Sequence, residues 1–273
     1  MNISNLRYRF CLVILFSLYF IDCKAQDESN KSTYFGGSFG INNNGIALLP
    51  TFSLNKPAGF LMLNVGNRLT FEPEFHFSLE GKPWTILLWG RYKLLQGEKF
   101  KLNVGAHPGL LFQPQMLSIN GAPPSEVITT ERYLAGELVP NYFFTPNTSI
   151  GLYYLNGNGF AESSSKRLNF LTFNANFRKI HLSEDYYLRF NPQVYYLNMD
   201  RVEGYFTSAV IAFARNDFPV AIQMLTNKSF KTDFPDTSDW MFSFSLIYSF
   251  GKNNNPVSNV ISQLGPISSL PIQ

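Results

Sequence analysis

The sequence predicts an all-β protein, a single antiparallel transmembrane β-barrel of twelve strands, with ten strands as the alternative. Three observations support this fold class. Aromatic residues make up 16% of the chain and charged residues only 15%, a composition that suits a surface dissolved in lipid. Apolar and polar residues alternate with a period of two in many segments, as in strands with two different faces. Clusters of Gly, Pro, Asn and Asp separate these segments and mark turns.

Residues 1–25 are typical of a secretory signal peptide. Arg7 and Arg9 precede the apolar run 10–21, and Ala25 provides a small residue for cleavage. The apolar run is shorter than the roughly 20 residues that a membrane-spanning helix needs, and no later run reaches that length. We therefore expect cleavage after Ala25 and no helical membrane anchor.

The mature chain offers little chemistry of its own. Both cysteines, Cys11 and Cys23, lie in the signal peptide, so the remainder can form neither a disulfide nor a thiolate metal site. The signal also holds three of the 22 basic and one of the 19 acidic residues, which leaves 19 against 18 and a net charge of +1. This balance predicts no nucleic-acid partner. With no H-x-x-x-H pair in the chain either, we expect no metal and no cofactor.

The clearest strand covers residues 240–250, WMFSFSLIYSF. One face is entirely apolar and mostly aromatic, whereas the other carries three serines. Such a strand fits lipid outside and a lumen inside, with Trp and Tyr near the interfacial belts. The residues expected to face the membrane are Trp240, Phe242, Phe244, Leu246, Tyr248 and Phe250.

The same period of two recurs along the chain. It is sharpest in residues 68–80, where Leu and Phe side chains alternate with Glu, Thr, His and Ser. Residues 100–112, 168–178 and 186–196 show similar faces.

Turn residues mark eleven connections and so predict twelve strands. Pro50 and Gly66 interrupt the alternation between residues 46 and 79, and for this reason ten strands remain the alternative. The expected connections are 42–45, 55–59, 80–83, 96–98, 114–130, 146–147, 158–166, 181–185, 200–203, 216–217 and 228–238.

The lengths of these connections predict the topology. All three long ones are odd-numbered (114–130, 158–166 and 228–238), and the even-numbered ones are short. Transmembrane barrels have short periplasmic turns and longer external loops. We therefore expect both termini in the periplasm, a barrel within residues 26–250, and a periplasmic tail at 251–273 that is flexible rather than a plug.

The signal peptide, the aromatic strands and a last strand ending in YSF resemble the outer-membrane β-barrel superfamily, porin-like in type, over residues 33–250. The resemblance implies the outer membrane of a Gram-negative bacterium, contact with its lipid, and recognition by the barrel-assembly machinery. In that family a terminal aromatic on the last strand is part of the recognition signal, and Phe250 with Tyr248 matches it. Here 23 residues follow Phe250.

Ionisable side chains that point into the lumen are the candidate functional residues, because an interior charge must pair or meet water. Folding two hairpins about their predicted turns places Glu72 opposite Arg91 and Lys93 opposite Lys101. Two interpretations are open: a structural ion network that fills a narrow lumen, or a constriction that selects solutes. The expected lumen cluster is Glu72, Glu74, His76, Arg91, Lys93, Lys101 and His107.

The function expected from this pattern is porin-like passage or binding of a small polar or amphipathic solute. The alternative is a non-conducting anchor that engages a partner through the loops 114–130 and 228–238 or through the tail. Barrels of eight strands are filled by side chains and those of 16–18 hold channels, so twelve strands allow either function. Because no G-x-S-x-G or other catalytic motif is present, we expect no enzyme.

Overall fold

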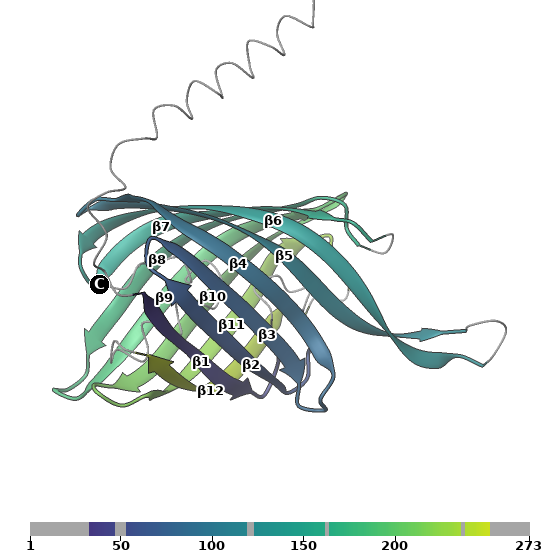
Figure 1. The fold of residues 1–273 in the computed structure, drawn as a ribbon, viewed down its shortest axis with the longest axis horizontal. Helices are drawn as coiled ribbons and strands as arrows, with labels where there is room; N and C mark the ends of the chain where they lie inside the picture. The colour runs from purple at the N-terminus through teal and green to yellow at the C-terminus, as the bar shows by residue number, and fades with distance from the viewer. Residues whose placement is uncertain (1–32, 47–52, 119–122, 162–163, 236–237, 252–273) are drawn as a thin grey trace, which may run out of the picture. The chain divides into compact units, whose positions relative to one another are not determined.

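The structure is a computed structural model, and it describes residues 33–46, 53–118, 123–161, 164–235 and 238–251. These residues form a closed antiparallel barrel in which each strand pairs with its neighbours in sequence and β1 pairs with β12 (Figure 1). The predicted fold class and the count of twelve strands are confirmed, and the alternative of ten is wrong. Within the described ranges, no helix is long and apolar enough to cross a membrane.

The strands differ in length, and the longest two are adjacent. Their bounds are β1 Tyr34–Asn42, β2 Ala58–Gly66, β3 Leu69–Ser78, β4 Pro83–Gln96, β5 Phe100–Leu117, β6 Ser125–Thr145, β7 Thr148–Gly159, β8 Leu168–His181, β9 Tyr186–Met199, β10 Val202–Arg215, β11 Val220–Thr232 and β12 Trp240–Gly251.

The predicted number of strands is right because two errors in the first third of the chain cancel. The expected turns at 42–45 and 55–59 belong to one connection, since β1 ends at Asn42 and β2 begins at Ala58. The turn between β2 and β3 was missed. There Gly66 has a φ of 131°, and a Cβ at this position would lie 2.1 Å from the carbonyl oxygen of Leu69. Only glycine adopts this backbone conformation without strain, so Gly66 allows the chain to turn from β2 into β3. The sequence pattern treated Gly66 as an interruption within a strand, whereas it is the last residue of β2.

The connections at the two ends of the barrel differ in length. The even-numbered connections have two to four residues, and we call the end of the barrel where they lie the short-turn end. The odd-numbered connections lie at the opposite end, which we call the long-loop end. They include the longer connections 43–57, 118–124, 160–167 and 233–239. β1 begins and β12 ends at the short-turn end. The signal peptide at 1–25 and the tail from 252 lie outside the described residues, and their roles stay predictions.

Two expected loops are partly strand. β5 continues to Leu117 and β6 starts at Ser125, so the connection expected at 114–130 shrinks to 118–124. β11 likewise continues to Thr232. The β5–β6 hairpin extends past its neighbours (Figure 1). The Lys82 ammonium donates to the Glu126 carboxylate and ties it to the β3–β4 turn. The ladder continues past the expected turn residues because every residue other than proline has a backbone N–H donor and every residue has a C=O acceptor, and the two facing strands pair these groups.

The exterior of the barrel is apolar and aromatic. In β12 the side chains alternate between exposed and buried, and five of the six expected outward residues are exposed, from 40% for Tyr248 to 53% for Phe244. The sixth, Phe250, is partly covered and lies 6.3 Å from the ring of Phe35, between ring centroids. Across the closing seam, the rings of Phe39 and Tyr248 are 5.1 Å apart. An exterior of this kind matches lipid.

We predict that Gly66→Ala destabilises the barrel by about 1–3 kcal/mol, because alanine must adopt a strained φ beside a backbone oxygen. The measurement is urea unfolding of the protein in phospholipid vesicles, followed by tryptophan fluorescence. Gly90→Ala is the matched control, since a Cβ there meets nothing nearer than an oxygen at 3.9 Å. Equal midpoints for the two variants would contradict the role of Gly66.

Candidate functional site

The lumen is filled largely by side chains. Inward-facing polar residues on every side of the barrel are buried, among them Ser38, Asn141, Thr172, Gln193, Gln223 and Ser243. Residues that line a wide aqueous channel would be exposed to solvent. The interior therefore resembles the core of a small barrel, and the described residues also enclose a cavity.

The structure places all seven residues of the expected lumen cluster inside the barrel. His76 and Lys93 are partly buried, and the others are at most 8% exposed: Glu72, Glu74, Arg91, Lys101 and His107. They do not form one cluster. Glu72 and Arg91 belong to an ion network, Glu74, His76 and His107 border the cavity, and Lys93 and Lys101 lie toward the short-turn end.

The predicted pairing of these residues across strands is wrong by two positions. Arg91 lies opposite Thr70 and Gly105, and Lys93 lies opposite Asn103. The main cause is the position of the turns, since Phe77 lies opposite Pro83 and Gln96 opposite Lys101, so each turn is centred one to two residues from its expected place. One-residue bulges between His76 and Phe77 and around Leu94 then change each register by one position. Because side chains alternate with a period of two, a shift of two residues leaves every side chain on its predicted face.

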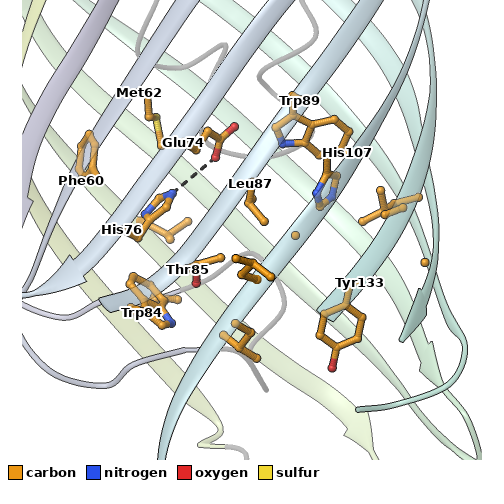
Figure 2. A pocket seen from close by; sticks show the side chains of 18 of the residues that line it. Phe60, Met62, Glu74, His76, Trp84, Thr85, Leu87, Trp89, His107 and Tyr133 are labelled. Atoms are coloured by element: carbon orange, nitrogen blue, oxygen red, sulfur yellow. Dashed lines mark hydrogen bonds and ion pairs between the residues drawn. The ribbon is translucent and has the colours of Figure 1, made fainter. Parts of the chain in front are cut away.

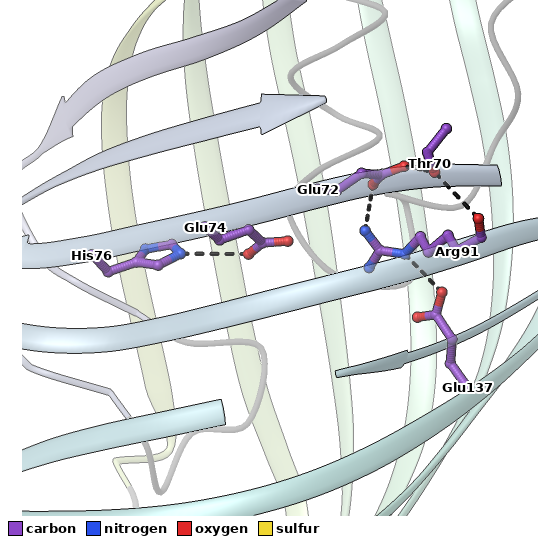
Figure 3. A network of polar contacts seen from close by, with 6 residues as sticks. All are labelled: Thr70, Glu72, Glu74, His76, Arg91 and Glu137. Carbon is purple, nitrogen blue, oxygen red and sulfur yellow. Dashed lines mark hydrogen bonds and ion pairs between the residues drawn. The ribbon is translucent and has the colours of Figure 1, made fainter. Parts of the chain in front are cut away.

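The ion network is centred on Arg91 (Figure 3). Its Nη1 donates to Glu72 Oε2 at 2.5 Å, and its Nε donates to Glu137 Oε1 at 2.7 Å. The Thr70 hydroxyl donates to the other oxygen of Glu72 at 2.7 Å. The guanidinium also lies 4.0 Å from the centre of the Trp89 ring. One cation thus holds two carboxylates from β3 and β6, and Glu72 reaches it diagonally instead of from the position directly opposite.

Glu137 was missed by the sequence reading, although its side chain is fully buried beside Arg91. The inward face of β6 also carries Glu131, Ala135 and Val139. This mixture of charged and apolar residues hides the alternation that marks the other strands. One sequence feature could have identified Glu137. It is four residues before Asn141, and residues separated by an even number in a strand share a face, so both point inward.

A cavity of about 230 Å³ occupies the long-loop half of the lumen (Figure 2). Its wall is mainly apolar and aromatic, with contributions from most strands. Near its polar side, His76 Nε2 lies 3.5 Å from Glu74 Oε2, and the ring centroids of His107 and Trp89 are 4.0 Å apart. Arg91 and His107 form its floor toward the short-turn end. The main apolar residues are Phe60, Met62, Trp84, Leu87, Trp89, Leu111, Tyr133, Tyr153, Leu155, Leu168, Val210 and Leu225.

The sequence carried no sign of this cavity. Trp84 and Trp89 are five residues apart, so a regular strand would send them to opposite faces. Both are buried in the lumen because β4 is irregular opposite His76 and Phe77. Aromatic side chains are expected on the lipid face of a barrel, and here a second set lies inside.

No metal site accompanies the cavity in the part of the chain that the structure describes, where no group of three or more His, Cys, Asp or Glu side chains could hold an ion.

The chain was compared with known proteins and solved structures. No protein-family model and no curated protein matches the chain. Similar solved structures include the NanC porin (11% identity, 80% of this chain and all of that one, TM-score 0.47). Others are the β domain of the Bordetella autotransporter BrkA (10%, 81% and 99%, TM-score 0.43) and LpxR from Salmonella typhimurium (11%, 79% and 99%, TM-score 0.38). The closed twelve-strand barrel has the architecture that the resemblance to outer-membrane β-barrels implied. The architecture alone does not indicate an activity.

We predict that Arg91→Ala lowers the free energy of unfolding by about 3–5 kcal/mol, because it leaves Glu72 and Glu137 buried without a counter-charge. Urea unfolding in vesicles measures the loss. Arg68→Ala is the control, since Arg68 is exposed on the exterior and lies over Tyr92. Adding Glu72→Gln and Glu137→Gln to Arg91→Met should recover most of the stability. A loss below about 1 kcal/mol for Arg91→Ala would mean that the network is no more important than a surface ion pair.

Proposed function

We propose that this chain is a barrel of a Gram-negative outer membrane and that its lumen binds a small amphipathic solute as the solute crosses the membrane. The observation that carries the proposal is the mainly apolar, aromatic cavity inside the lumen, which is bordered by the polar side chains of Glu74, His76 and His107. Small-molecule sites are concave and mainly apolar, with a few polar groups that orient the ligand. The interior of a transmembrane barrel is otherwise expected to be polar.

The exterior supports a membrane location. Exposed aromatic and aliphatic side chains lie on every strand except β2, including Phe35, Phe71, Tyr142, Phe173 and Ile222. A soluble protein with so large an apolar surface would aggregate. Outer-membrane lipid is therefore the partner proposed for this surface, and the barrel-assembly machinery is the partner proposed for Phe250 and Tyr248 during insertion.

The cavity suggests how the solute would lie. Its apolar part would contact the rings of Trp84, Trp89 and Tyr133, which face the same space (Figure 2). The buried carboxylate of Glu74 on the same wall is a hydrogen-bond acceptor, with His76 beside it. We therefore expect a solute with a hydrogen-bond-donating head, an amine or a hydroxyl.

The Arg91 network supports a gated rather than an open pathway. Arg91 and Glu137 fill the lumen at the floor of the cavity, and both are almost fully buried. A solute moving to the short-turn end would have to displace them. The two interpretations of the lumen charges are then compatible, because a structural ion network also acts as the constriction.

A non-conducting anchor is the second candidate. The observation that favours it is the β5–β6 hairpin, which extends past the other strands and exposes Met116 and Ile128. Apolar residues on an arm of this kind suit a protein partner. The two candidates differ in conductance and in ligand binding, and both are measurable on the purified barrel.

We predict that 1-aminoanthracene, an amphipathic amine, binds the barrel in lipid nanodiscs with a rise in its fluorescence. Ala135→Phe should weaken this binding about tenfold or more, because it adds a ring inside the cavity at a position that is buried. Leu134→Phe is the matched control, since the neighbouring side chain is half exposed on the exterior. Equal binding by the two variants would exclude the cavity as the site.

We also predict small, infrequent conductance steps for the wild-type barrel in a planar bilayer, because the lumen is filled at Arg91. The triple variant Glu72→Ala, Arg91→Ala, Glu137→Ala removes that filling and should conduct in larger steps. The matching triple substitution on the exterior is Phe71→Ala, Tyr92→Ala and Leu138→Ala. A lumen variant that folds and stays silent would argue against passage and favour the anchor.

A further inference from the structure

The short-turn end of the lumen carries a group of cations on four strands. Lys101 on β5 is buried, and Lys93 on β4, Arg178 on β8 and Arg189 on β9 are partly buried. Lys101 lies within electrostatic range of both Lys93 and Arg178, and Arg189 lies within range of Arg178. Several like charges are thus held together in a narrow space, where their repulsion costs free energy.

Aromatic rings lie against three of these four cations. The Lys101 ammonium and the Arg178 guanidinium each lie 5.0 Å from the centre of the buried Phe143 ring. Lys179 and Arg189 lie 5.3 and 5.8 Å from the Tyr187 ring. A bulge in β8 between Phe177 and Ile180 lets two consecutive basic residues reach inner rings.

Acidic residues do not neutralise Lys101 and Arg178. Neither takes part in an ion pair among the described residues. The acidic side chains in the turns of this end are exposed, namely those of Glu98, Glu184, Asp185 and Asp217, and Asp185 pairs with Arg215. Within the lumen, the Glu72 carboxylate attracts the Lys93 ammonium electrostatically, but it already forms an ion pair with Arg91. In addition, the buried Nη2 of Arg178 has no hydrogen-bond partner within the described ranges.

We propose that Lys101 and Arg178, with Lys93 and Arg189 around them, form a binding site for a small oxyanion, a phosphate or carboxylate group. An anion there would relieve the repulsion and accept charge-assisted hydrogen bonds from the ammonium and the guanidinium. The partly exposed side chains leave the site open to solutes from the short-turn end. The site is separate from the aromatic cavity and does not depend on the function proposed for it.

The test uses the full chain in neutral detergent, titrated with sodium phosphate or sodium acetate at constant ionic strength. Thermal unfolding is followed by tryptophan fluorescence. A bound anion raises the unfolding temperature in a saturable way, because it binds only the folded barrel. A response to phosphate alone identifies a phosphate site, and a response to both anions identifies a general oxyanion site.

The double variant Lys101→Gln, Arg178→Gln should need about tenfold more anion or more for the same rise, since charge-assisted hydrogen bonds are lost. Without anion, its unfolding temperature should equal or exceed that of the wild type, because like charges have been removed. A merely structural role would lower it. Arg215→Gln, at the same end but exposed and paired with Asp185, should respond like the wild type.

Three outcomes overturn the proposal: no saturable rise in the wild type, an unchanged response in the double variant, or an equal loss in Arg215→Gln. If the double variant does not fold, each single substitution is tested in the same way and should still weaken the response. Ala135→Phe should leave the anion response unchanged, so failure of the cavity proposal and failure of this one are distinguishable.

Discussion

The pairing of β1 with β12 is the constraint on which the rest of the structure depends. The hydrocarbon core of a bilayer offers no water to backbone N–H and C=O groups, so an open sheet edge there is too costly. Seven residue pairs from Gly36–Gly251 to Asn42–Ser245 close the ladder and remove both edges. Once the sheet is closed, every strand has one face toward the exterior and one toward the lumen, and the alternation of residue types follows from that geometry.

Closure also determines how the interior is stabilised. Charges inside a filled lumen lose most of their hydration, so each needs a partner. Arg91 meets this need with two carboxylates and the face of Trp89. Lys101 and Arg178 lie instead against Phe143, a weaker compensation. The lumen therefore has three levels along its axis: an aromatic cavity, an ion network that closes its floor, and a basic end.

Sequence reasoning succeeded where a single strand carries the signal. The faces of Trp240–Phe250 and the inward direction of Glu72, Arg91 and Lys101 follow from the period of two alone. It failed where two strands must be aligned. The Glu72–Arg91 ion pair forms on a diagonal, and Glu137 joins it from a strand 46 residues away in sequence. The position of a turn predicted to within one or two residues cannot give such a register, because each residue of error in the turn centre moves the register by two positions and each bulge moves it by one more.

By itself, the sequence determined the fold class and most inward and outward faces, since these depend on local alternation. The expected count of twelve strands is right only because two errors in turn placement cancel. Only the tertiary structure decided that Gly66 ends a strand, that Trp84 and Trp89 share one cavity, and that Lys101 and Arg178 meet at Phe143. The physical reason is that closing the barrel brings distant strands together across the lumen. Which side chains then meet depends on strand register and bulges, and no short segment of sequence contains that information.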